Sequence, residues 1–197
     1  MTPPDETLGD AYFEDVYRAS DDPWNFETSA YEQAKYARTL AALPRERYAR
    51  ALEVGCSIGV LTGLLAERAD RLLSVDVSAK ALARARERNR ERGGVTFERR
   101  RLPGETPGGP FDLIVLSEVG YYFSRPDLEE VLDRLTERLA PGGDLILVHW
   151  TPFVPDYPQT GDAVHEAALR RTPAPLTHRH GERHEHYRLD VLSKPAS

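Results

Sequence analysis

The pattern of apolar and polar positions predicts strands and helices in alternation. Strands are expected in the buried segment that starts at Leu52 and leads into a glycine turn, and at residues 71–77, 95–99, 111–116 and 145–148. Between several of them, apolar residues recur every three or four positions, as in amphipathic helices, at residues 58–69, 79–92 and 124–139. Strands that alternate with helices predict an α/β fold with a doubly wound, mostly parallel sheet.

Local signals set the expected ends of these helices. Ser78 is placed to cap the helix that starts at residue 79, and Gly93-Gly94 is expected to stop it. Ser124-x-x-Asp127 opens the next helix, for which Pro141-Gly142-Gly143 is the expected end.

Two peripheral segments flank this core. Residues 1–45 hold seven of the seventeen aromatic residues, which indicates a helical cap or lid over a pocket. Residues 151–175 are proline-rich at both ends around an expected helix at 161–171. An antiparallel hairpin of strands 176–180 and 184–192 brings the expected sheet to seven strands. We therefore expect one domain over residues 1–197, with the cap at 1–45, a core at 46–150 and a substrate-side insertion with the hairpin at 151–197.

The segment around residue 55 joins a buried strand to a helix through a glycine turn. Asp76 ends the following strand, 21 residues after Gly55, which is the length of one strand-helix-strand unit. Dinucleotide-binding loops need three glycines, as G-x-G-x-x-G, so that a pyrophosphate meets bare backbone, and an acid about 20 residues later for the ribose. Ser57 and Val60 replace the second and third glycines. The loop therefore favours S-adenosylmethionine, which has no phosphate, over NAD.

The same glycines also suit an ordinary strand-to-helix turn, in which they serve only close packing. Glu53 and Asp76, in register on two strands, favour the binding function. Cys56 is interpreted as a small residue tolerated beside the ligand rather than as a nucleophile, and a single cysteine forms no internal disulfide.

Composition narrows the function classes. With 40% hydrophobic and 29% charged residues in 197 positions, the chain has the composition of a soluble globular domain. A net charge of −6 argues against nucleic-acid binding, and the arginines of residues 83–92 alternate with glutamates as on a solvated helix face. Since no apolar run reaches membrane-span length and residues 1–6 are not those of a signal peptide, we expect no membrane association and a cytoplasmic location.

Motifs outside the glycine loop are more specific than the loop itself. They are Asp22-Pro23-Trp24-Asn25-Phe26-Glu27-Thr28-Ser29-x-Tyr31-Glu32-x-x-Lys35-Tyr36, Leu116-Ser117-Glu118-Val119-Gly120-Tyr121-Tyr122, Val148-His149-Trp150 and Asp156-Tyr157-Pro158-x-x-Gly161-Asp162-x-Val164-His165. With them the chain resembles nodulation protein S over most of residues 12–192. That family has the Rossmann-like fold of class I S-adenosylmethionine-dependent methyltransferases and contains N-methyltransferases of chitooligosaccharides. The resemblance implies methyl transfer to a small-molecule acceptor, with the amine of an amino sugar or oligosaccharide expected, and S-adenosylhomocysteine as product.

The resemblance also implies cofactor contacts. Asp76 would bind the ribose hydroxyls, the backbone from Glu53 through Gly59 the methionine portion, and Trp24 with Tyr31 would close over the ligand. The expected cofactor residues are Trp24, Tyr31, Glu53, Gly55, Cys56, Ser57, Gly59, Asp76, Val77, Leu102 and Ser117. The third strand departs from the family pattern, because Arg100-Arg101-Leu102 stands where many class I methyltransferases have an acid against the adenine amine.

Two side chains that follow central strands, Glu118 and His149, are candidate general bases. An amine acceptor must lose a proton before it attacks, and histidine titrates near neutral pH. The alternative is that both only fix the pocket by hydrogen bonds. Flat aromatic faces and polar groups nearby predict an acceptor site at Tyr121, Tyr122, Trp150, Tyr157, Asp162 and His165.

A histidine cluster and two other functions complete the sequence-based hypotheses. His178, His180, His184 and His186 flank a predicted turn at 181–183 and could face one another around zinc or nickel, but an exposed polar hairpin face is the favoured interpretation and no metal is expected. The other functions are O-methylation of another small metabolite and cofactor binding without catalysis.

Overall fold

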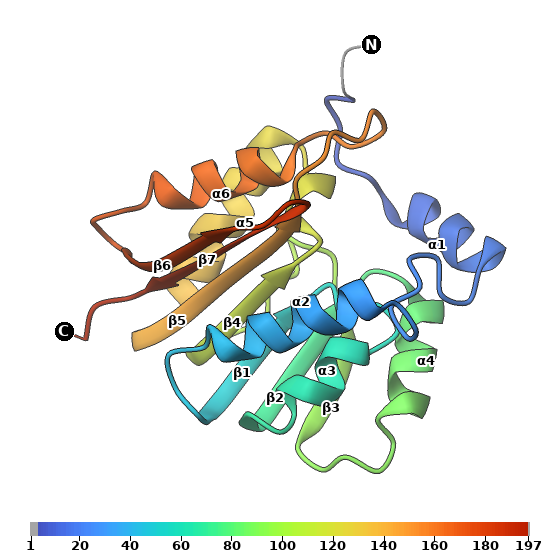
Figure 1. Ribbon diagram of the computed structural model, residues 1–197, viewed down its shortest axis with the longest axis horizontal. Helices are drawn as coiled ribbons and strands as arrows, with labels where there is room; N and C mark the ends of the chain where they lie inside the picture. Colours follow the sequence, from blue (N-terminus) through green and yellow to red (C-terminus); the bar gives the residue numbers. More distant parts are fainter. Residues whose placement is uncertain (1–3, 197) are drawn as a thin grey trace. The chain divides into compact units, whose positions relative to one another are not determined.

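The predicted alternation of strands and helices is present in the computed structural model, which describes residues 4–196 (Figure 1). Within those residues, seven strands follow the order β3-β2-β1-β4-β5-β7-β6. The pairs β1–β2, β2–β3 and β4–β5 are parallel, whereas β5–β7 and β6–β7 are antiparallel. The predicted mostly parallel α/β sheet with an antiparallel C-terminal hairpin is therefore confirmed. The described chain divides into two compact units, one of residues 9–100 and the other of the remaining residues.

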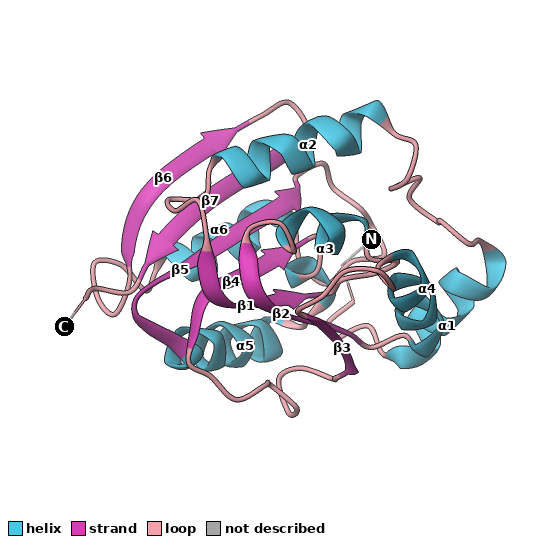
Figure 2. Ribbon diagram, turned by 90° about the horizontal axis from the view of Figure 1, so that it is seen from below, coloured by secondary structure: helices cyan, strands magenta, loops and turns pink. Residues whose placement is uncertain are grey.

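The unit of residues 9–100 contains three parallel strands and four helices. Its elements are α1 (Asp10–Ala19), α2 (Ala30–Ala41), β1 (Tyr48–Val54), α3 (Val60–Leu65), β2 (Ala69–Asp76), α4 (Ala79–Arg88) and β3 (Val95–Arg99). Fully buried Leu52, Leu72 and Leu82 come from β1, β2 and α4 and form part of its core. Helix α1 lies beside α4 (Figure 2). The cap expected at residues 1–45 thus consists, where described, of two helices and their connection.

The second unit holds the other four strands. After residue 100 its elements are β4 (Phe111–Ser117), the short 3₁₀ helix η1 (Gly120–Tyr122), α5 (Arg125–Arg138), β5 (Leu139–Trp150), α6 (Gly161–Leu169), β6 (Thr177–Arg183) and β7 (Tyr187–Ser193). Helix α6 packs against β5 and β7 and beside α5 (Figure 1). Because β4 and β5 are covered and fully buried through most of their length, they read as continuous apolar runs in the sequence.

Several predicted boundaries were wrong. Helix α4 ends at Arg88 rather than at residue 92, because the side chain of Asn89 donates to the carbonyls of Ala85 at 2.9 Å and Gly59 at 3.0 Å and so closes the last turn. Helix α3 is only six residues long, against the expected 58–69. Strand β5 begins at Leu139 instead of 145, and the Pro-Gly-Gly segment expected to end α5 lies within that strand, where its pairing with β4 is irregular.

The hairpin turn was also misplaced. Strand β6 extends to Arg183 and β7 starts at Tyr187, so the turn holds residues 184–186 instead of 181–183. His184 and His186 therefore lie in the turn, and the register shifts between His178 and His180 on β6. The two facing histidine pairs expected from strict alternation are not formed.

Gly59 is predicted to be intolerant of any side chain. Its φ is +78°, and a Cβ would lie 2.9 Å from Ala85 Cα on α4. Gly59→Ala should lower the free energy of unfolding by about 1–3 kcal/mol, because it adds left-handed strain to a steric clash. Urea denaturation measures this change. Gly93→Ala is the matched control, since nothing lies within 4 Å of its Cβ position; equal losses in the two variants would contradict the packing argument.

Candidate functional site

The side chain of Glu53 on β1 joins this strand to α3 and β2, the elements around the glycine loop. Its Oε2 accepts hydrogen bonds from the hydroxyls of Thr62 on α3 at 2.6 Å and Ser74 on β2 at 2.7 Å. Burial raises the pKa of Glu53 to about 7 despite these two bonds. Only 2% of Glu53 is exposed, so its side chain supports the loop from the interior.

The loop after β1 is bent by three residues with positive φ, Gly55, Ser57 and Gly59, and is held by the end of β2. Gly55 has φ 76° and Ser57 has φ 50°. The amides of Gly55 and Cys56 both donate to the carbonyl of Val75, at 2.8 and 3.0 Å. Asp76 then accepts the Ser57 amide on Oδ2 at 2.9 Å and the Ser78 amide on Oδ1 at 2.8 Å. One carboxylate therefore joins β2 to both the glycine loop and the start of α4.

This arrangement fits the nucleoside that the sequence predicts. Burial raises the pKa of Asp76, and the backbone amides of Ser78 and Ser57 act in the opposite direction by favouring its charged form. Each carboxylate oxygen has a second lone pair, so Asp76 can keep its amide bonds and still accept two vicinal hydroxyls. A carboxylate accepts hydrogen bonds from ribose hydroxyls, whereas its negative charge would repel a phosphate.

An aromatic cluster from the N-terminal segment covers the glycine loop. The hydroxyl of Tyr17 lies 2.5 Å from Oγ of Ser57, and Tyr17 packs with Ile58 and Ala81 in one buried cluster. Trp24 contacts the ring of Tyr17 edge-on at 5.8 Å and stacks on Phe26 at 5.5 Å. Sequence reasoning selected Trp24 but missed Tyr17, whose only signal was its place on the apolar stripe of α1.

Helix α1 also supplies a cap to α4 that the sequence did not reveal. Glu14 accepts the amide of Ala79 at 3.0 Å and the hydroxyl of Ser78 at 3.2 Å. A carboxylate at a helix N-terminus is favoured by the exposed amides and the helix dipole. The covering segment is thus tied to the same turn that Asp76 binds.

Other expected cofactor residues have different surroundings. Cys56 is 3% exposed and packs with Leu82 and Ala85, so its thiol faces the core, and burial raises its pKa. Tyr31 lies in the first turn of α2, with the Lys35 ammonium 5.4 Å from its ring. The carbonyl of Val77 accepts a bond from Arg99 at 2.8 Å. Leu102 and Ser117 belong to the second unit and are described with it.

In the second unit, a carboxylate and aromatic rings come together after β4. Ser117 ends β4, and Glu118 follows it with the unusual φ of 57°. Oε2 of Glu118 accepts the Tyr121 hydroxyl at 2.5 Å and the Trp150 amide at 2.9 Å. Tyr121 stacks on Tyr157 with centroids 5.0 Å apart and rings inclined by 13°. Strained backbone of this kind is concentrated at functional sites, so residues 117–122 form the candidate acceptor loop.

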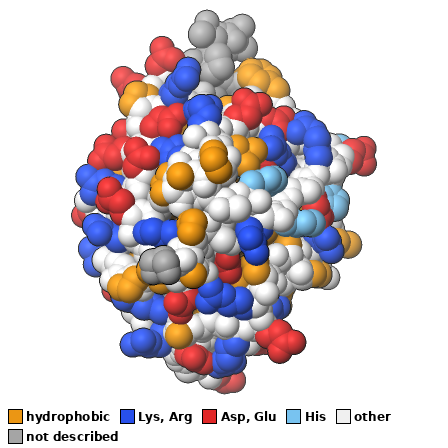
Figure 3. Space-filling model, turned by 90° about the vertical axis from the view of Figure 1, so that its left-hand side faces the viewer, with side chains coloured by type: hydrophobic (Ala, Val, Ile, Leu, Met, Phe, Trp, Pro, Cys, Tyr) orange, Lys and Arg blue, Asp and Glu red, His pale blue; other side chains and the backbone are white. Residues whose placement is uncertain are grey.

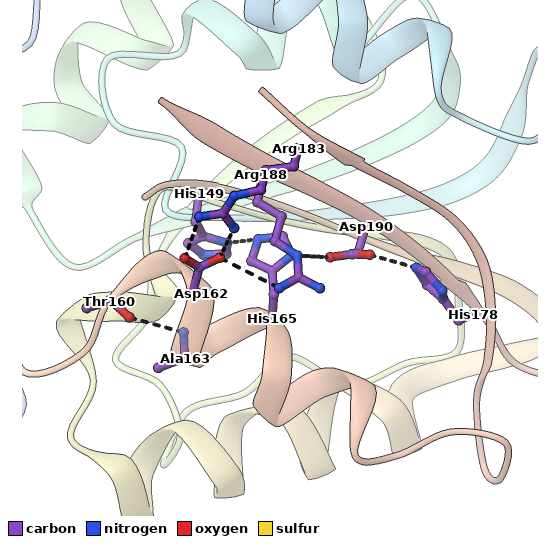
Figure 4. A network of polar contacts seen from close by, with 9 residues as sticks. All are labelled: His149, Thr160, Asp162, Ala163, His165, His178, Arg183, Arg188 and Asp190. Atoms are coloured by element: carbon purple, nitrogen blue, oxygen red, sulfur yellow. Dashed lines mark hydrogen bonds and ion pairs between the residues drawn. The ribbon is translucent and has the colours of Figure 1, made fainter. Parts of the chain in front are cut away.

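Further expected acceptor residues lie around this loop. Tyr122 contacts Tyr157 through their hydroxyls, 3.4 Å apart. His149 and His165 are fully buried, with Nδ1 of His149 3.1 Å from Nε2 of His165. Asp162 is held by the guanidinium of Arg183 (Figure 4). Leu102 is 7% exposed and contributes to the buried apolar residues of the unit.

The rest of the surface formed by residues 4–196 carries many charged side chains. No group of three or more histidine, cysteine, aspartate or glutamate side chains is arranged to hold a metal ion in that range. Figure 3 shows basic and acidic side chains interspersed over the visible face. Arg84 and Arg88, expected on a solvated face, pair with Asp21 and Glu27 of the α1–α2 connection. In the described part of the chain, every helix is too short or too polar to cross a membrane.

Glu53 is predicted to make stability depend on pH. Its pKa rises from 4.5 to about 7 on folding, so its stabilising contribution is full below pH 4.5 and is lost as the pH rises through about 7. Glu53→Gln should therefore gain stability relative to wild type between pH 4.5 and 8, by on the order of 3 kcal/mol. Chemical denaturation at both pH values measures this difference. Glu91→Gln, at a side chain 85% exposed, is the control; a Glu53→Gln difference that is constant with pH would contradict the raised pKa.

Comparisons with known proteins find similar sequences and a similar fold. Nodulation protein S of Bradyrhizobium diazoefficiens is 38% identical over 130 residues, which are 65% of this chain and 62% of that protein. Trans-aconitate 2-methyltransferase of Azoarcus sp. is 32% identical over 149 residues, 74% of this chain and 54% of that enzyme. The crystal structure of the N-methyltransferase NodS from Bradyrhizobium japonicum WM9 with S-adenosyl-L-homocysteine shares the fold, with a TM-score of 0.82 at 23% identity over 95% of this chain and 100% of that one.

The family assignment rests on a family profile rather than on a single relative. The chain spans under two thirds of the length of these two sequence relatives. The profile of the family described as nodulation protein S (NodS) matches residues 14–150, which include both the glycine loop and the acceptor loop. The chain belongs to the nodulation protein S family.

Proposed function

We propose that this chain is an S-adenosylmethionine-dependent N-methyltransferase whose acceptor is the amine of an amino sugar or oligosaccharide. The observation that carries the proposal is the carboxylate of Asp76, held by the amides of Ser57 and Ser78 at the end of β2. It supplies acceptors for ribose hydroxyls beside a glycine loop that lacks the glycines a pyrophosphate needs. The ligand bound in the related NodS structure, S-adenosyl-L-homocysteine, is consistent with this preference.

On this proposal, the residues around the loop hold and orient the cofactor. Asp76 accepts the ribose hydroxyls, the bent backbone of residues 53–59 receives the methionine portion, and Tyr17 fixes the side chain of Ser57. When bound, S-adenosylmethionine supplies an electrophilic methyl group on a sulfonium. Alignment of the reactants and exclusion of water contribute on the order of 7–11 kcal/mol to such a displacement. The aromatic cluster of Tyr17, Trp24 and Phe26 supplies the exclusion of water on this side.

The acceptor loop suits a cationic amine with an apolar face. Glu118 offers an anionic group, and the stacked rings of Tyr121 and Tyr157 offer flat surfaces of the kind that pack against sugar rings. Glu118 is the better candidate general base, because it is partly exposed, whereas His149 is fully buried and its Nε2 accepts the Gly120 amide at 3.0 Å. We therefore assign proton acceptance to Glu118 and the alternative role, fixing the pocket, to His149.

O-methylation is the second candidate, since the similarity to trans-aconitate 2-methyltransferase covers 74% of this chain. A polycarboxylate acceptor would place like charge beside Glu118, which disfavours it relative to an amine. The free, buried thiol of Cys56 agrees with a reducing compartment, and we place the enzyme in the cytoplasm.

Mass spectrometry of the purified chain with S-adenosylmethionine tests the proposed function. The acceptor is a short chitooligosaccharide with one free terminal amine, and its fully N-acetylated form is the control. We expect methylated sugar and S-adenosylhomocysteine together with the free amine only. Methylation of trans-aconitate instead would favour the O-methyltransferase; calorimetric cofactor binding without any product from either acceptor would favour the non-catalytic function.

Glu118→Gln is predicted to separate base catalysis from positioning. Gln keeps an acceptor for Tyr121 and Trp150 but cannot take a proton, so kcat should fall about 10²-fold. The Kd of S-adenosylhomocysteine, measured by calorimetry, should not change. Glu130→Gln is the control, because Glu130 is half-exposed on α5 and pairs with Arg134. A loss below about threefold, typical of a weak polar contact, would assign Glu118 a positioning role only.

A further inference from the structure

A buried chain of hydrogen bonds links the acceptor loop to the C-terminal hairpin, and Figure 4 shows its part from His149 through His165 to Asp190. Its first bond runs from the Gly120 amide to Nε2 of His149, at 3.0 Å. Nδ1 of His149 is then 3.1 Å from Nε2 of His165, and Nδ1 of His165 is 2.6 Å from Oδ2 of Asp190 on β7. Both histidines are fully buried and Asp190 is 2% exposed, so bulk water does not compete for these bonds.

The two ends of this chain fix the direction of every bond in it. An amide can only donate, so Nε2 of His149 must carry a lone pair. Neutral His149 then has its proton on Nδ1 and donates it to Nε2 of His165. His165 in turn has its proton on Nδ1 and donates it to the carboxylate of Asp190. All three bonds are therefore satisfied by a single state, in which both rings are neutral Nδ1–H tautomers.

Three glycines allow this chain to form. A Cβ on Gly120 would lie 2.5 Å from Val164 Cγ1 and 2.9 Å from His149 Nε2. At Gly181 a Cβ would lie 2.7 Å from Oδ1 of Asp190, and at Gly161 it would overlap the Trp150 carbonyl. Side chains are thus excluded next to both ends of the hydrogen-bond chain, at Gly120 and Gly181, and beside β5, at Gly161. Tight packing of backbone against the imidazole and the carboxylate leaves the side-chain positions little freedom.

The hydrogen-bond chain ends on the backbone amide of Gly120, and this end excludes proton transfer along it. A peptide N–H does not take up and release protons as a side chain does, so a proton cannot pass from His149 through Gly120 to Glu118. What the chain can do is hold the position of Gly120, and with it η1. Tyr121, the next residue, donates to Glu118 and stacks on Tyr157.

We propose that Asp190 is a positioning residue for the acceptor loop, acting through His165 and His149 on Gly120. It sets the tautomer of both histidines and so keeps the Gly120 amide, Tyr121 and Glu118 in the geometry that receives the acceptor. The kinetic consequence rests on the proposed methyltransferase function. The structural consequence, the tautomers and the immobilised Gly120 amide, does not.

Protonation of either ring is incompatible with this state. A second proton on His149 or His165 would place two donors opposite each other, at Gly120 or between the rings. Burial lowers the pKa of His165, and the nearby Asp190 carboxylate only partly opposes that. The titratable and charged groups around the two rings are Tyr121 of η1, Asp162 of α6, His178 and Arg183 of β6, and Arg188 and Asp190 of β7. The bonds from Gly120 to Asp190 therefore require both rings to be neutral.

Nitrogen-15 NMR of the wild-type protein at pH 7.5 tests the tautomers without any substitution. The proposal requires Nδ1–H and an unprotonated Nε2 in both His149 and His165, with a scalar coupling across the His149–His165 bond. An Nε2–H tautomer in either ring overturns it. Because this measurement uses the unchanged protein, it decides the proposal even if a variant fails to fold.

Asp190→Asn tests the positioning itself. It removes the charge that orders His165, so amide exchange at Gly120 should speed up about tenfold, and kcat/KM for the acceptor should fall by about the same factor. The Kd of S-adenosylhomocysteine should stay unchanged. Asp144→Asn is the matched control, because Asp144 is a buried carboxylate of the same sheet, 3% exposed, that binds the Ser193 hydroxyl at 2.6 Å. It should leave Gly120 exchange within about twofold of wild type.

The outcomes separate this inference from the proposed function. Unchanged Gly120 exchange in Asp190→Asn, or equal acceleration in Asp144→Asn, overturns the positioning role. If the wild-type protein methylates no acceptor, the proposed function fails, while the ring tautomers and the Gly120 exchange still decide the inference.

Discussion

The carboxylate of Asp76 is the contact on which the candidate cofactor site depends. It ends β2 and accepts the amides of Ser57 in the glycine loop and Ser78 at the start of α4. Both amides belong to backbone that no helix or strand ladder would otherwise pair, so the bonds fix a loop of positive-φ residues in one shape. Glu53 supports the same loop from below, through Thr62 and Ser74, and is fully enclosed. One partly exposed acid, Asp76, and one buried acid, Glu53, thus hold the same loop.

The N-terminal segment is attached to the elements that Asp76 joins. Tyr17 contacts Ser57, and Glu14 accepts the amide of Ala79, the residue after Ser78. Loss of order in α1 would therefore expose both the glycine loop and the first turn of α4. A buried acid has a similar role in the second unit, because Asp190 holds the acceptor loop through two histidines, His165 and His149. In both units a carboxylate determines the conformation of backbone at the end of a strand.

The sequence predicted those features that depend on local pattern. The structure brings the glycine loop and Asp76 together, as expected from the one strand-helix-strand unit between them, and Ser124 caps α5. Tyr17, Glu14 and Asp190 were not selected, because their roles come from contacts between segments far apart in the chain. Asp190 did leave a signal, since it is the one charged residue within the apolar run of residues 189–192. The hairpin turn was misplaced because a register shift on β6 breaks the alternation on which strand predictions rely.

A crystal structure with S-adenosylhomocysteine tests the central claim, that Asp76 binds the nucleoside while it holds the loop. We predict the ribose hydroxyls within hydrogen-bond distance of both Asp76 oxygens, with the amide bonds from Ser57 and Ser78 retained. A nucleoside bound away from Asp76, or one that displaces the Ser57 amide from its carboxylate, would contradict the account.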